Sequence, residues 1–187
     1  MKTLEYFKLP KLRVQALALL GVLMALDIII SRFTVGTAFL QISFTFITGG
    51  LIAKWYGPLW GLPAAFLIDF LTNLMSGQPY IIAFTLVKLL SALIFGIAYY
   101  QREQLSWTRI TVTVFLQLLL ANVILNTYLL SVYNFIPVHS LAAAISSPII
   151  WARVLKSAIM WPIEVMLSYA ILNNKNLEQL RKDAFER

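Results

Sequence analysis

The 187-residue chain is too apolar for a protein dissolved in water, because 60% of its residues are hydrophobic and only 12% are charged. Soluble domains contain roughly 45–50% apolar and about 25% charged residues. A membrane-spanning helix needs about 20 mostly apolar residues, so the length suits an all-α integral membrane bundle of six helices folded as a single domain. With no cysteine and one histidine, His139, we expect no catalytic thiol and no metal centre.

Six apolar stretches, separated by turn residues, are predicted to cross the membrane in chain order. Gly57-Pro58 separates the second stretch from the third, and Ser76-Gly77-Gln78-Pro79 precedes the fourth. Residues 134–147 are too polar to cross, although the Leu-Ala-Ala-Ala segment at 141–144 could lie along the membrane interface. The predicted helices are 14–31, 40–56, 58–74, 80–100, 110–133 and 148–172, followed by a solvated amphipathic tail over 173–187.

Basic residues predict the orientation. With six spans, eleven of the fifteen Lys and Arg residues fall on the side of the termini. The positive-inside rule therefore places both termini in the cytoplasm. This distribution explains the net charge of +7 without nucleic acid, which would need a basic face on a water-exposed domain. The eleven residues are Lys2, Lys8, Lys11, Arg13, Lys54, Arg102, Arg109, Lys175, Arg181, Lys182 and Arg187.

Ionisable groups within the spans predict a pocket, because each costs about 2.5–3.5 kcal/mol in a bilayer and is usually kept to face a cavity or a partner. In the predicted topology these groups gather in the outer leaflet, and only Glu164 lies deep. Four cations, Arg32, Lys88, Arg153 and Lys156, oppose Asp27 and Asp69 at that level. The excess of positive charge favours a ligand that carries a carboxylate or phosphate, and Arg153 is the preferred contact because its planar fork can make two hydrogen bonds.

Aromatic and amide side chains complete the predicted site. Their flat rings could stack on a ligand, or could belong to an interfacial aromatic belt. Two further alternatives stay open: Lys88 and Lys156 could reach the head groups, and Asp69 could pair with Lys88. The predicted substrate-binding residues are Arg32, Asp69, Tyr80, Phe84, Lys88, Asn126, Tyr128, Arg153 and Lys156.

The first predicted helix carries small residues, Ala18, Gly21 and Ala25, on one face. Small residues allow another helix to approach closely. This face could pack inside the protein, or it could dock a second membrane protein.

Catalytic motifs are missing from the sequence. No Gly-rich loop ends in Lys-Ser or Lys-Thr to bind nucleotide phosphates, and one histidine does not complete a Ser-His-Asp set. We therefore predict a binding subunit without catalytic residues, metal or cofactor. The alternatives are a small intramembrane enzyme that uses Asp69 or Glu164, and a purely structural subunit.

Several segments resemble a known family in order along nearly the whole chain. They include Ala25-Leu26-Asp27, Tyr56-Gly57-Pro58, Asn126-Thr127-Tyr128, Arg153-Val154-Leu155-Lys156 and Pro162-Ile163-Glu164. The chain resembles the S component, the vitamin-binding membrane subunit, of energy-coupling factor (ECF) importers, most closely the folate type.

The resemblance implies a six-helix fold, an outward vitamin pocket, and assembly with a transmembrane coupling protein and two cytoplasmic ATPase subunits. It also implies that the small-residue face of the first helix meets the coupling protein. Residues 76–83, Ser-Gly-Gln-Pro-Tyr-Ile-Ile-Ala, depart from the Pro-Thr-Gly-x-Tyr-Phe-Pro-Gly stretch of the folate type. Pantothenate, another anionic vitamin, is therefore kept as the alternative ligand.

Overall fold

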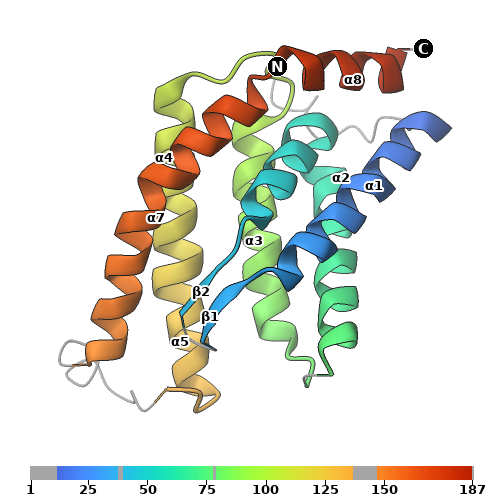
Figure 1. The fold of residues 1–187 in the computed structure, drawn as a ribbon. Helices are drawn as coiled ribbons and strands as arrows, with labels where there is room; N and C mark the ends of the chain where they lie inside the picture. Colours follow the sequence, from blue (N-terminus) through green and yellow to red (C-terminus); the bar gives the residue numbers. More distant parts are fainter. Residues whose placement is uncertain (1–11, 38–39, 78, 137–146, 187) are drawn as a thin grey trace, which may run out of the picture.

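The computed structural model describes residues 12–37, 40–77, 79–136 and 147–186 and shows a bundle of membrane-spanning helices (Figure 1). Within these ranges five helical stretches are long and apolar enough to cross a membrane. The helices are α1 (Val14–Arg32), α2 (Thr45–Ser76), α3 (Ile82–Tyr99), α4 (Trp107–Gln117), η2 (Leu118–Leu125), α5 (Asn126–Val132), α7 (Pro148–Leu172) and α8 (Lys175–Glu186), and the strands are β1 (Val35–Thr37) and β2 (Leu40–Ile42). Lys2, Lys8, Lys11, His139 and the segment 141–144 lie outside the described residues.

Helix α2 consists of two segments that reverse direction at Gly57, as the sequence predicts. Gly57 has a φ of 70°, a left-handed conformation that glycine adopts without steric cost. A Cβ atom at this position would also lie 2.7 Å from the ring of Tyr100. The reversal turns one 32-residue element into two segments, so the described chain contains the six predicted helical segments.

A β-hairpin stands where the sequence analysis predicts the start of the second helix. Strands β1 and β2 pair antiparallel, with Val35 opposite Ile42, and α2 begins only at Thr45. The prediction of helix over residues 40–44 is therefore wrong. The periodicity of a short apolar run does not distinguish a helix from a strand. The fold is therefore an all-α bundle with one added β-hairpin.

The fifth helical segment is continuous from Trp107 to Val132 but changes its winding in the middle. Helix α4 passes into the π-helix η2, and α5 follows. Figure 1 places this segment beside α7. Helix α7 also packs directly on α2, and α3 packs on both α2 and the fifth segment.

Helix α8 lies across the end of the bundle at which α1 begins and α7 ends (Figure 1). It packs on α1, and Phe185 lies against Tyr56 with the ring centroids 5.2 Å apart. The buried ammonium of Lys54 forms an ion pair with Glu178 (3.2 Å) and donates to the carbonyl of Glu103 (3.0 Å). The tail that is predicted to be solvated therefore contains a helix, α8, that packs against the bundle.

Candidate functional site: a polar cavity between the helices

A cavity of about 710 Å³ lies among α2, α3, the fifth segment and α7. Its lining includes Pro79, Ile81 and Phe135, which come from the connections at the end of the bundle opposite α8 (Figure 1). Sites for small ligands usually measure roughly 300–1,000 Å³ and combine apolar walls with a few placed polar groups. The volume and lining therefore fit a small organic molecule.

Five charged side chains face this cavity: Asp27, Asp69, Lys88, Lys156 and Glu164. Three carboxyl groups thus accompany two ammonium groups, so the predicted excess of positive charge is wrong for the lining itself. Glu164, which is predicted to lie deep, also lines the cavity. Depth along a single helix does not reveal how far the space between helices extends.

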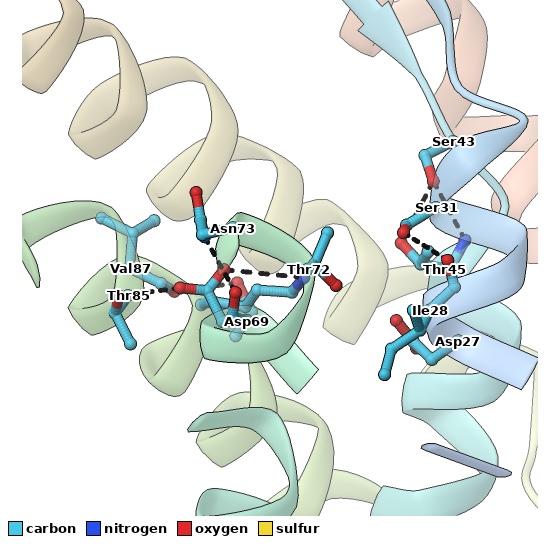
Figure 2. A network of polar contacts seen from close by, with 12 residues as sticks. Asp27, Ile28, Ser31, Ser43, Thr45, Asp69, Thr72, Asn73, Thr85 and Val87 are labelled. Atoms are coloured by element: carbon cyan, nitrogen blue, oxygen red, sulfur yellow. Dashed lines mark hydrogen bonds and ion pairs between the residues drawn. The ribbon is translucent and has the colours of Figure 1, made fainter. Parts of the chain in front are cut away.

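Asp69 is held by neighbours on two helices (Figure 2). Its Oδ2 accepts a hydrogen bond from the Thr85 hydroxyl (2.7 Å), and Lys88 Nζ lies 3.8 Å from its Oδ1. Asn73 donates to the backbone carbonyl of Asp69 (2.9 Å). The pairing of Asp69 with Lys88, which the sequence analysis leaves open, is present here and links α2 to α3.

Asp27 presents an unused acceptor. The residue is 3% exposed and lines the cavity. Its Oδ2 accepts a hydrogen bond from the hydroxyl of Thr48, whereas its Oδ1 has no hydrogen-bond partner among the described residues. Because an unsatisfied buried acceptor costs about 1–3 kcal/mol, a donor on a ligand would be favoured at this oxygen.

Lys156 and Glu164 place opposite charges at different levels of the same cavity wall. Both belong to α7 and are separated by about 12 Å along the helix axis, at 1.5 Å per residue. Within the described part of the chain neither forms a hydrogen bond or an ion pair. The cavity is therefore dipolar, with an available cation toward its open end and an available carboxylate deeper.

Phe84 and Asn126, two of the predicted substrate-binding residues, also line the cavity. Asn122 and Gln117 face it as well and, like Asp27 and Glu164, are absent from the predicted site. The amide side chains of Asn122 and Gln117 in an otherwise apolar helix are the sequence feature that could have identified them as site residues. Helical periodicity does not bring positions 117 and 126 together, because nine residues make two and a half α-helical turns.

Four predicted site residues lie outside the lining. Arg32 is exposed and donates to Ser76 and to the carbonyl of Thr72. Tyr128 is exposed. Tyr80 is linked to the site through the Thr85 hydroxyl, which lies 2.8 Å from its own hydroxyl.

Arg153, the preferred ligand contact of the sequence analysis, is the fourth of these residues and does not line the cavity. The side chain is buried and directed at the fifth segment, where its Nε donates to the Thr127 hydroxyl (2.9 Å) and its Nη2 donates to the carbonyl of Asn122 (3.0 Å). A guanidinium placed in this way supports the wall of the cavity from behind.

The small-residue face of α1 is exposed. Ala18, Gly21 and Ala25 are all on the surface, and a Cβ atom at Gly21 would meet nothing within 4 Å. Among the described residues no group of three His, Cys, Asp or Glu side chains could hold a metal ion.

A helical membrane bundle with a dipolar cavity that opens at one end defines a class of small-molecule-binding membrane proteins. Sequence comparison identifies the family within that class. Residues 15–172 match the family model "ECF transporter, substrate-specific component". This chain belongs to that family.

Individual relatives agree with the family. A folate transporter FolT of Leuconostoc mesenteroides subsp. mesenteroides is 40% identical over 178 residues, which cover 94% of each chain. A folate transporter FolT of Streptococcus mutans serotype c is 30% identical and covers 94% of this chain and 95% of the relative. A crystal structure of FolT bound with folic acid aligns with a TM-score of 0.75 and 32% identity, over 86% of this chain and 94% of the other.

Proposed function

We propose that this chain is the folate-binding S component of an ATP-driven importer and takes its ligand from outside the cell. The observation that carries the proposal is the dipolar cavity of about 710 Å³ in a relative of folate transporters. Pantothenate, the alternative ligand, has no comparable support.

Folate matches the two ends of the cavity. Its pterin ring carries N–H groups that suit the free carboxylate oxygens of Asp27 and Glu164, and its glutamate carries carboxylates that suit Lys156. Phe84 offers an aromatic face to the rings between these ends. The ligand would therefore enter with the pterin first and leave its glutamate toward the opening.

The chain would work with partners. We infer that ATP hydrolysis belongs to two cytoplasmic ATPase subunits and that a transmembrane coupling protein joins them to this chain. The exposed face at Ala18, Gly21 and Ala25 allows the close helix approach such a partner would need. Both termini and α8 would lie in the cytoplasm of the bacterial cell, as the positive-inside rule predicts.

Saturation binding to the purified chain tests the proposal. Tritiated folate and tritiated pantothenate are added separately, without ATP and without partner subunits. We expect saturable binding of folate alone. Binding of pantothenate alone would favour the alternative, and binding of neither would contradict a vitamin receptor.

A further inference from the structure

The fifth segment carries a π-helix, η2 (Leu118–Leu125), where it borders the cavity. In this region the N–H of Asn126 bonds to the carbonyl of Ala121, five residues back. In an α-helix the same N–H would bond to the carbonyl of Asn122, four residues back. The Asn122 carbonyl is thus released from the α-helical pattern. Such π-bulges are rare and occur frequently at functional sites.

The wider turn changes which side chains face the cavity. Gln117 and Asn126 are nine residues apart, so in a regular α-helix of 3.6 residues per turn they would point in opposite directions. Here both line the cavity, together with Ala121 and Asn122. The π-helix takes up the extra residue, so that one helix presents three amide side chains to the same space.

Arg153 contacts this irregular turn at two points. Its Nη2 donates to the released carbonyl of Asn122 (3.0 Å), and its Nε donates to the hydroxyl of Thr127 (2.9 Å). That hydroxyl lies 3.4 Å from the same Asn122 carbonyl. The planar fork of arginine can reach both acceptors at once, which the single ammonium of lysine does not reproduce.

We propose that Arg153 is a positioning residue, which stabilises the π-helix and thereby keeps Asn122 and Asn126 directed at the ligand. The role of Arg153 in holding the π-helix does not depend on which ligand binds, and only the identity of the ligand rests on the proposed function. Arg153 thus acts on the ligand through Asn122 and Asn126, and Lys156 is the cation that faces the ligand carboxylate.

A labelling experiment without ligand tests this geometry. Because the natural chain has no cysteine, the variant Asn126→Cys carries a single thiol on the cavity wall. We expect a water-soluble maleimide to label this thiol about fivefold more slowly when Arg153→Lys or Thr127→Val is added, since each change removes a hydrogen bond at the turn. Leu155→Ala, on the exposed side of α7, serves as the control and leaves the rate unchanged. Unchanged labelling in both test variants would overturn the proposal.

A binding experiment then separates positioning from direct contact. Folic acid and pteroic acid, which lacks the glutamate, are titrated against the wild-type chain and Arg153→Lys. A positioning role predicts that both ligands lose affinity by the same factor. A loss confined to folic acid would assign Arg153 to the glutamate and overturn the proposal. Failure of the wild-type chain to bind folic acid would instead contradict the proposed function, and the labelling rates would still decide the role of Arg153.

Discussion

At the scale of single residues, Lys156 is the cation that the cavity leaves without an ion pair among the described residues, whereas Lys88 lies 3.8 Å from Asp69. We expect Lys156→Gln to weaken folate binding by about 10- to 150-fold, which corresponds to the roughly 1.5–3 kcal/mol of a charge-assisted hydrogen bond. Isothermal titration of the purified variant measures this loss.

Arg32→Gln is the matched control for Lys156→Gln, because Arg32 is also a cation near the site but bonds to Ser76 and Thr72 at the surface. It should leave the affinity within about twofold, as expected for an exposed polar contact. Equal losses in the two variants would contradict the assignment of Lys156 to the ligand.

At the scale of elements, the left-handed conformation of Gly57 allows the two segments of α2 to reverse direction. Gly57→Ala would hold an alanine in the left-handed backbone conformation and press its Cβ against the Tyr100 ring. We therefore expect the substitution to lower the free energy of unfolding by about 1–3 kcal/mol. Thermal unfolding in detergent measures the change. Gly21→Ala, where a Cβ meets nothing within 4 Å, should leave the melting temperature unaltered, and a similar loss in both variants would contradict this account.

The attachment of α8 should depend on pH through Glu178. Burial alone would raise the pKa of this carboxyl, but the hydrogen bond from Arg181 and the charge of Lys54 outweigh burial and hold the pKa below its ordinary value of 4.5. A lowered pKa in the folded state stabilises the protein above pH 4.5, and that contribution is lost as the pH falls through the lowered pKa. Limited proteolysis of α8 at decreasing pH should therefore show release of the helix.

Glu178→Gln should release α8 already at neutral pH, because it leaves the buried ammonium of Lys54 without its ion pair. Proteolysis of this variant should then depend little on pH over the acidic range. A variant that is protected like the wild-type chain at neutral pH would contradict the role of the ion pair.

The sequence predicts the elements better than the site. Long apolar stretches and the Gly57-Pro58 pair define the helical segments because both depend on local properties. The pairing of β1 with β2 was not predicted, because a short apolar run suits a strand and a helix alike. The π-helix at Leu118–Leu125 lies where Arg153 bonds to Asn122 and Thr127, a contact between distant parts of the chain. Its charge and its planar fork marked Arg153 as a ligand contact, whereas its hydrogen bonds to Thr127 and Asn122 direct it at the fifth segment.

At the scale of the whole molecule, the exposed small-residue face of α1 is the proposed docking surface. We expect Gly21→Leu to block co-purification with the coupling protein and to abolish uptake, because a bulky side chain prevents close helix approach. Folate binding by the isolated chain should be unchanged, since position 21 does not line the cavity. Normal assembly of the variant would contradict docking at this face.

A native mass spectrum of the chain, purified without ATPase subunits from cells supplied with folate, tests most directly whether this protein is a folate receptor on its own. We expect a complex of one chain with one folate, and we expect Lys156→Gln to reduce it greatly. A spectrum in which the wild-type chain carries a different molecule, or stays empty at saturating folate, would contradict it.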